Sequence, residues 1–242
     1  MKLKRLLTAA LSAVMALSVC ALPAMAAGTT AATTPNPVWS QDHGSITIHK
    51  YELNEESKKK TGTGNEKDAV DAEAKQLAGA EFTIYQIWNK NTLKGYYDGV
   101  TDTATTGVFD INKYAKKNAT TGAWELALKP GFSATIVDKA GLTNPQTTPD
   151  SGTVTFDNLD LGLYLVLETK LPDLVVEAAT PAIISVPMQK DSDNTVADAN
   201  KQPVTEWLYD VHIFPKNATK YGSVKLIKKG YTGSTEDGKL QN

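Results

Sequence analysis

The sequence has almost no cysteine and little histidine. Its one cysteine, Cys20, lies in a segment that we expect to be removed, so the mature chain would lack disulfides, cysteine nucleophiles and thiolate ligands. His43, His49 and His212 are scattered, and no glycine-rich phosphate loop is present. We therefore expect no metal site, no cofactor and no enzymatic activity on substrates outside the chain itself.

Residues 1–26 have the parts of a secretory signal peptide. Three basic residues precede an apolar run from Leu6 to Leu22, and small residues around Ala26 form a cleavage site. A membrane anchor is one alternative, although such a span needs roughly 20 apolar residues. Lipidation of Cys20 is another, and the bulky Val19 before it disfavours that reading. We expect a secreted protein.

Removal of this segment makes the chain more acidic. The whole sequence has 25 Lys and Arg against 27 Asp and Glu, and residues 1–26 contain three of the basic residues and none of the acidic ones. The mature chain would thus carry 22 against 27, a net charge of −5. This balance does not favour nucleic acid or an anionic membrane as a partner.

The remaining chain divides by composition. Residues 27–41 are rich in Ala, Thr and Pro, which is typical of a flexible leader. Residues 42–220 are expected to form one large domain. In residues 221–242 the segment GSVKLIKKG repeats the pattern of GSITIHKYE at 44–52, so we expect the first strand of a second, incomplete domain. Chance similarity of two apolar strands is the alternative.

Short strand-like segments dominate the domain at 42–220. Ile46, Ile48 and Lys50 alternate and so share one strand face. Other strands are expected where β-branched and aromatic residues lie between turn residues, at 80–88, 94–100, 151–159, 162–170 and 176–189. A short helix is expected within 108–118. The pattern indicates an all-β, antiparallel sandwich of immunoglobulin-like, Greek-key type.

The segment WLYDVHIFPKN, residues 207–217, presents a lysine just after a strand. Alternate residues from Trp207 to Ile213 form one face, and Pro215 cannot donate to a continuing ladder. We therefore expect Lys216 to be released from the sheet edge. An ordinary solvated lysine is the alternative reading.

This segment resembles the pilin motif of sortase-assembled pilus backbone subunits of Gram-positive bacteria. The matching residues are Trp207, Val211, Ile213, Phe214, Pro215, Lys216 and Asn217. Ile213 and Phe214 depart conservatively from the valine and tyrosine of the family. The segments GSITIHK, LAGAEFTIYQIW and NLDLGLYLVLET resemble the family's first strand, second strand and glutamate box, so the resemblance extends over nearly the whole mature chain.

The resemblance implies a cell-wall pilus subunit and its partners. In that family a lysine amine attacks the thioester between a sortase and another subunit, and Lys216 is the matching position. Identical subunits and a pilus-class sortase are the implied partners, with host surface ligands as further candidates. A monomeric, wall-anchored adhesin of the same fold is the alternative function.

The resemblance also implies an internal amide between Lys50 and Asn217, assisted by Glu168. The residues agree, since Lys50 follows two isoleucines on one face and Glu168 lies in the apolar segment YLVLET. Burial disfavours the charged forms of amines and acids and so promotes attack by the amine. A plain Lys50–Glu168 ion pair, or two unrelated solvent-exposed side chains, are the alternatives.

Overall fold

The computed structural model describes residues 39–53, 64, 74–99, 107–189 and 207–220. Three predicted segments lie wholly or mostly outside these residues: the signal peptide, the leader and the start of a second domain. In the described part of the chain, no helix has the length and apolar character needed to cross a membrane.

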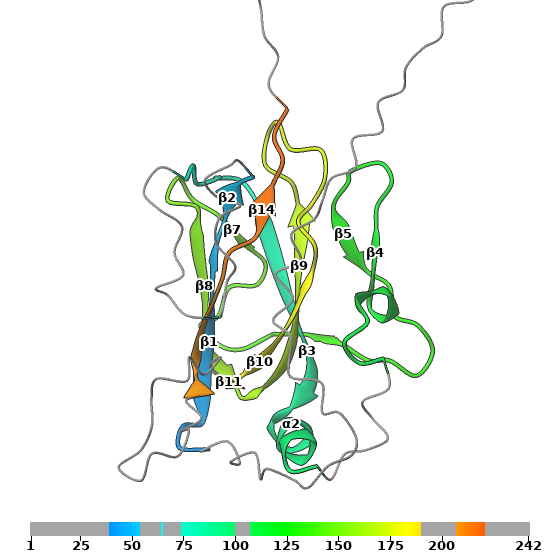
Figure 1. The fold of residues 1–242 in the computed structure, drawn as a ribbon, viewed down its shortest axis with the longest axis vertical. Coiled ribbons are helices and arrows are strands. Elements are labelled where there is room, and N and C mark those ends of the chain that lie inside the picture. The colour runs from blue at the N-terminus through cyan, green and yellow to red at the C-terminus, as the bar shows by residue number, and fades with distance from the viewer. Residues whose placement is uncertain (1–38, 54–63, 65–73, 100–106, 190–206, 221–242) are drawn as a thin grey trace, which may run out of the picture.

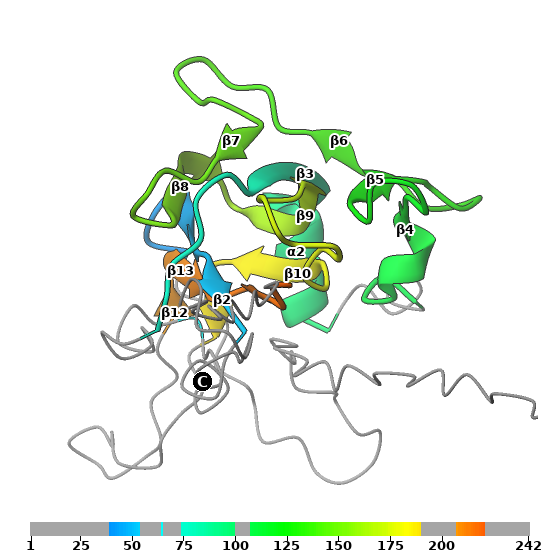
Figure 2. The same cartoon turned by 90° about the horizontal axis from the view of Figure 1, so that it is seen from above.

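Two sheets pack face to face and form a sandwich (Figures 1 and 2). In spatial order, the first sheet is β13 (Asp210–Ile213), β1 (His43–His49) and β8 (Thr153–Asp160). The second is β10 (Ala182–Val186), β9 (Gly162–Lys170), β3 (Glu81–Asn89) and β6 (Thr135–Ile136), with β7 (Gln146–Thr147) also paired to β3. The all-β sandwich expected from the sequence is confirmed.

Smaller elements extend these sheets. Three strand pairs are β2 (Tyr51–Glu52) with β14 (Lys216–Asn217), β4 (Ala115–Lys117) with β5 (Trp124–Leu126), and β11 (Met188–Gln189) with β12 (Trp207–Leu208). Among the residues that the structure describes, the helical elements are α2 (Lys90–Tyr97) and the 3-10 turn η2 (Ile111–Lys113). The β4–β5 hairpin lies beside the second sheet, away from the first (Figure 2).

Strand β9 is buried on both faces, which explains its nearly continuous apolar sequence. Tyr164 and Val166 face the first sheet and pack with Ile46 and Ile48. Leu163, Leu165 and Leu167 face the other way, toward α2 and the β4–β5 hairpin. Burying each large apolar side chain stabilises the fold by roughly 1.5–3 kcal/mol. Glu168, at the end of this run, is therefore carried into a largely apolar interior.

The first and last strands of the domain lie side by side and run parallel. Ile46 pairs with Val211 and Ile48 with Ile213, and the parallel pairing continues when β14 joins β2. The other main ladders are antiparallel, as expected. Parallel pairing of two segments far apart in sequence brings the end of β1 next to the chain that follows Pro215.

Two secondary-structure expectations are wrong. Residues 94–100 were expected to form a strand, but Lys90–Tyr97 is helix α2. Asn89 caps this helix by accepting a hydrogen bond from the Thr92 backbone, and Leu93 is buried against the second sheet. The aromatic pair Tyr96–Tyr97 looks strand-like in the sequence, but the cap and the buried leucine favour a helix.

The helix expected within 108–118 is reduced to η2. The Asp110 side chain accepts a hydrogen bond from the Asn112 backbone and starts this short turn. Beyond it, Ala115–Lys117 pairs with Trp124–Leu126 as a hairpin. Hairpin pairing and the burial of Tyr114 and Ala115 override the local helical preference.

Candidate functional site

Three polar side chains meet inside the sandwich at the end where β2 and β14 pair. Lys50, Glu168 and Asn217 are 0%, 1% and 1% exposed. Lys50 directly follows β1, Glu168 comes from β9, and Asn217 comes from β14. The three residues named from the sequence for an internal amide are thus brought into contact.

The three side chains form a closed triangle of hydrogen bonds. Lys50 Nζ donates to Asn217 Oδ1 at 2.6 Å and to Glu168 Oε2 at 3.1 Å. Asn217 Nδ2 donates to Glu168 Oε1 at 2.7 Å. The amine therefore lies within hydrogen-bonding distance of both the amide and the acid.

Backbone contacts and an aromatic ring fix the amine. The Lys50 backbone donates to Gly152 O at 2.8 Å and accepts from Leu77 N at 3.0 Å. Lys50 Nζ lies 5.5 Å from the centre of the Phe82 ring, and Phe82 is the β3 residue that pairs with Glu168. Gly152 is required here, because a Cβ would lie 2.8 Å from Lys50 O and its φ is +63°.

Burial lowers the pKa of the Lys50 amine from 10.5 to about 8, although the charge and hydrogen bond of Glu168 act in the opposite direction. Roughly one Lys50 in ten would then be neutral at pH 7. An unperturbed lysine is almost fully protonated at that pH. The site therefore makes a nucleophilic amine far more available than solvent does.

This shift predicts how stability depends on pH in a chain that cannot form the internal amide. In Asn217→Ala, the unfolded state keeps the Lys50 proton up to a pKa near 10.5, whereas the folded state releases it near pH 8. The unfolded state thus binds more protons between these pH values, so the free energy of unfolding should rise by up to about 3 kcal/mol across that window.

Denaturant titrations of Asn217→Ala and of Asn217→Ala/Lys50→Met at several pH values measure this contribution. The difference between the two variants removes the titration of other groups. If the free energies of unfolding of the two variants change with pH in parallel from pH 8 to 10, the result would contradict the lowered pKa of Lys50.

Lys216 lies next to Asn217 but points the other way. Neighbouring residues of a strand face opposite sides, so Asn217 is buried while Lys216 is only half-buried. Partial burial lowers the pKa of the Lys216 amine. One two-residue strand therefore turns an amide inward and an amine outward.

The prediction that Lys216 is released from the sheet edge is wrong for its backbone, which stays paired with β2. Tyr51 N donates to Pro215 O at 3.0 Å, and Leu53 N donates to Asn217 O at 2.7 Å. Pro215 interrupts the ladder at one residue because it lacks an N–H, but its carbonyl still accepts. Lys216 is thus held by β2 rather than leaving the sheet.

The other residues of the motif pack the last strand onto the first. Val211 and Ile213 are buried in the core, and the Phe214 ring stacks on Tyr51 at 6.5 Å between centres. Trp207 is half-buried, and its ring packs nearly perpendicular to the Tyr97 ring with 5.0 Å between the ring centres. The motif's apolar residues therefore set the position of Lys216 and Asn217.

Two histidines that are far apart in sequence meet in space. His49 Nε2 lies 2.9 Å from His212 Nδ1, and the His49 ring also stacks on Phe214 at 4.9 Å. His43 lies elsewhere, 3.1 Å from Asp160. Within the described ranges, no three His, Cys, Asp or Glu residues are grouped to hold a metal ion.

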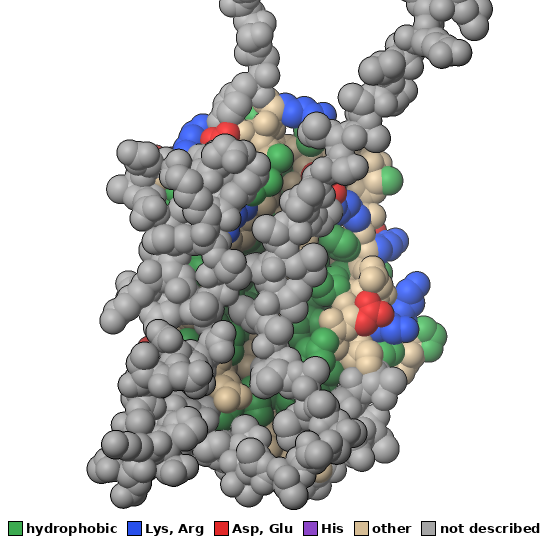
Figure 3. All heavy atoms as spheres, in the orientation of Figure 1, with side chains coloured by type: hydrophobic (Ala, Val, Ile, Leu, Met, Phe, Trp, Pro, Cys, Tyr) green, Lys and Arg blue, Asp and Glu red, His purple; other side chains and the backbone are tan. Residues whose placement is uncertain are grey.

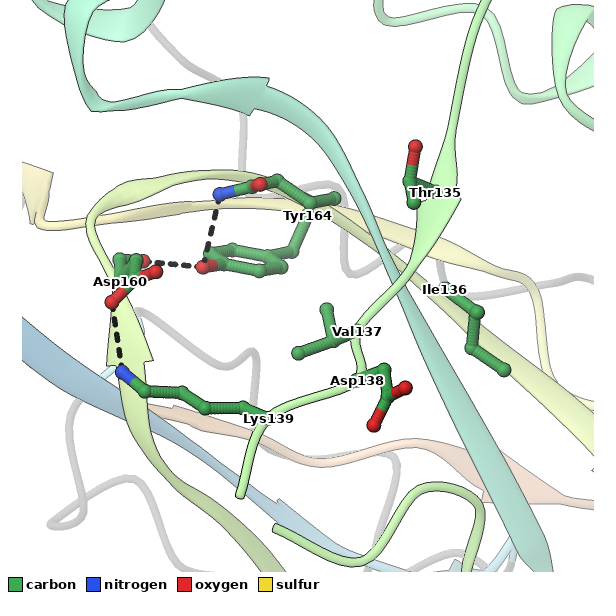
Figure 4. Close-up of a pocket in the computed structure, with 8 residues that line it drawn as sticks. Thr135, Ile136, Val137, Asp138, Lys139, Asp160 and Tyr164 are labelled. Carbon is green, nitrogen blue, oxygen red and sulfur yellow. Dashed lines mark hydrogen bonds and ion pairs between the residues drawn. The ribbon is translucent and has the colours of Figure 1, made fainter.

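A small open cavity of ≈ 260 Å³ lies at the opposite end of β9 (Figure 4). Its rim holds a Lys139–Asp160 ion pair at 2.8 Å, and the Tyr164 hydroxyl donates to the Asp160 carbonyl. None of its lining residues belongs to the Lys50 triangle. The cavity is therefore separate from the site.

One partner of the site has no signal in the sequence. The backbone N–H of Ala179 donates to Glu168 Oε2 at 2.7 Å. Because every residue except proline has such a donor, the side-chain pattern does not indicate which one will reach the acid.

Comparison with known proteins identifies the family of the chain. Residues 41–218 match the family described as the Gram-positive pilin subunit D1, N-terminal domain. The chain is 30% identical over 218 residues to a fimbrial subunit type 2 of Actinomyces naeslundii, covering 86% of this chain and 35% of the relative. It is 30% identical over 194 residues to a fimbrial subunit type 1 of Actinomyces viscosus, covering 79% and 29%.

Two solved structures are also similar to part of the chain. The full-length major pilin SpaD of Corynebacterium diphtheriae is 29% identical, with 74% of this chain and 33% of that chain covered and a TM-score of 0.43. The fimbrial protein FimP of Actinomyces oris is 27% identical, with 73% and 30% covered and a TM-score of 0.43. The chain spans about a third of the length of these relatives. By the match over residues 41–218, the chain belongs to the family of the Gram-positive pilin subunit D1, N-terminal domain.

Proposed function

We propose that this protein is a subunit of a covalently polymerised pilus, with Lys216 as the acceptor amine for a sortase and a self-formed amide between Lys50 and Asn217. One observation carries the proposal. A buried amine, acid and amide are in mutual contact, and the residue before the amide in β14 turns a second amine toward the surface.

The internal reaction starts from a charged pair. As observed, Lys50 Nζ donates to Asn217 Oδ1 and Asn217 Nδ2 donates to Glu168, which suits an ammonium and a carboxylate. Transfer of one proton from Lys50 to Glu168, with rotation of the amide, gives a neutral amine and a protonated acid that donates to Oδ1. This second state is the reactive one, because only a neutral amine can attack.

Bond formation then conserves atoms and protons. Lys50 Nζ attacks Asn217 Cγ while protonated Glu168 stabilises the negative charge that develops on Oδ1. Glu168 takes a proton from Nζ and delivers one to Nδ2, so the Cγ–Nδ2 bond breaks and ammonia leaves. Glu168 ends protonated, as in the reactive state, because it keeps the proton that it first took from the Lys50 ammonium, and no external reagent is needed.

The intersubunit reaction would use Lys216. Its neutral amine attacks the acyl carbon of a thioester between the sortase cysteine and another subunit. An amide forms, the C–S bond breaks, and the sortase cysteine leaves as a thiol with the proton that the amine loses. Partial burial favours the neutral amine, while β2 fixes the backbone on either side. The subunit supplies position, and the sortase supplies the activated carbonyl.

The intact mass of residues 27–242 tests the internal amide. The parent chain should be lighter than its calculated mass by one ammonia, and Lys50→Ala and Glu168→Ala should each have their full calculated mass. Lys216→Ala is the matched control and should keep the deficit, because this lysine faces away from the triangle.

A parent chain of full calculated mass would remove the internal amide from the proposal. Peptide mapping would locate the bond in a chain with the deficit, since Lys50 and Asn217 should then appear in one branched peptide. A branched peptide containing Lys216 instead would overturn the division of roles between the two lysines.

A further inference from the structure

The acid of the site is held by a segment that lies between β9 and β10. Glu168 Oε2 accepts from both Lys50 and the Ala179 backbone, while Oε1 faces Asn217. Because the Ala179 N–H donates to Oε2 at 2.7 Å, Oε2 must act as an acceptor oxygen. When the acid is protonated, this arrangement leaves Oε1 to carry the proton toward the amide that must be polarised.

The segment around Ala179 is in turn held by the β4–β5 hairpin. Trp124 Nε1 donates to Ala179 O at 2.9 Å, and Ala178 N donates to Gly122 O at 3.1 Å. Lys117 Nζ lies 2.5 Å from Glu177 Oε1. Three consecutive residues, 177–179, are thus tied to one hairpin, whose outer edge carries neighbouring basic and acidic side chains (Figure 3).

Close approach of the hairpin depends on Gly122. Its φ is +73°, and a Cβ at this position would lie 2.4 Å from Val176 O. Any other residue would push the hairpin and the segment apart. The same segment also contacts the chain beyond Asn217, since Val175 bridges to Thr219 and Lys220 N donates to Leu174 O at 3.0 Å.

We propose that Trp124 and Gly122 are positioning residues for formation of the Lys50–Asn217 amide, acting on Glu168 through the Ala179 backbone. This inference rests on the proposed internal amide. Neither residue touches the reacting atoms. Together they fix the N–H that orients the carboxyl group, and within the described chain Lys50 is the one charged group in contact with that carboxyl.

The test follows ammonia loss with time by intact mass after synthesis of residues 27–242 in a cell-free system. Trp124→Phe keeps an aromatic ring in place but removes the indole N–H. It should slow ammonia loss about tenfold, because small misplacements of a catalytic group are costly. Tyr97→Phe removes a side-chain hydrogen bond to Ser185 elsewhere on the sheet and should leave the rate unchanged.

A further measurement separates positioning from stability. In an Asn217→Ala background, where no bond can form, adding Trp124→Phe should change the thermal midpoint no more than adding Tyr97→Phe. A purely structural role would lower that midpoint further.

Gly122→Ala is a second variant that acts on the same contact from the backbone, and it should also slow ammonia loss. If Trp124→Phe and Gly122→Ala both lose ammonia as fast as the parent, the inference is overturned, while the proposed internal amide is not affected. A slow rate in Trp124→Phe, together with a thermal midpoint in the Asn217→Ala background that falls further than with Tyr97→Phe, would also overturn it, in favour of a structural role. Absence of ammonia loss from the parent would overturn both proposals.

Discussion

Replacing Glu168 with alanine should lower the free energy of unfolding by more than about 5 kcal/mol. Without the acid the internal amide does not form, and that bond would close a loop between positions 167 residues apart. Loop-closure entropy assigns a cross-link of this span about 5 kcal/mol. The variant also leaves the fully buried Lys50 amine without its carboxylate, which adds a further cost.

Guanidinium denaturation of the parent, Glu168→Ala and Lys50→Met measures this effect. Lys50→Met also prevents the amide but replaces the amine with an apolar side chain of similar length, so it should lose less stability than Glu168→Ala. Equal midpoints for the parent and Lys50→Met would mean that the amide contributes nothing to stability.

Replacing Lys216 with arginine should abolish covalent polymers altogether. The substitution keeps the positive charge and a long side chain, but a guanidinium stays protonated and cannot attack a thioester. Co-expression with a pilus-class sortase, followed by boiling in detergent and electrophoresis, should show a ladder of multimers for the parent and monomer alone for Lys216→Arg. The ammonia deficit should be unchanged in this variant.

Lys220→Arg is the matched control, because it changes an exposed lysine only four residues further along. It should form the same ladder as the parent. A ladder that persists in Lys216→Arg would assign the acceptor role to another amine. A parent that forms no ladder would favour the monomeric adhesin.

The sequence predicts the three residues of the buried triangle better than what surrounds them. Lys50 and Glu168 could be named because alternation places one on a core-facing strand face and an apolar run encloses the other. Their meeting with Asn217 follows from the family resemblance, since no local pattern predicts a parallel pairing between segments so far apart. The contribution of Ala179 could not be predicted, because a backbone donor leaves no mark in the sequence.

Local competition explains the remaining differences. At Lys90–Tyr97 an asparagine cap and a buried leucine outweigh the strand-like tyrosines. At Lys216 the preceding proline predicts that strand pairing ends. The Pro215 carbonyl nevertheless accepts a hydrogen bond, and pairing with β2 continues for two residues. In both places, one hydrogen-bonded group changes the element.

The adjacency of Lys216 and Asn217 in β14 sets the load path of such a polymer. If a neighbouring subunit pulls on the Lys216 side chain and the chain continues beyond Asn217, tension enters and leaves the backbone one residue apart. The sandwich formed by the preceding residues then lies beside the taut chain and bears little of the force. In that arrangement the Lys50–Asn217 amide would attach the strand under tension covalently to the domain. It would keep β14 paired with β2 while the rest of the domain is not stretched.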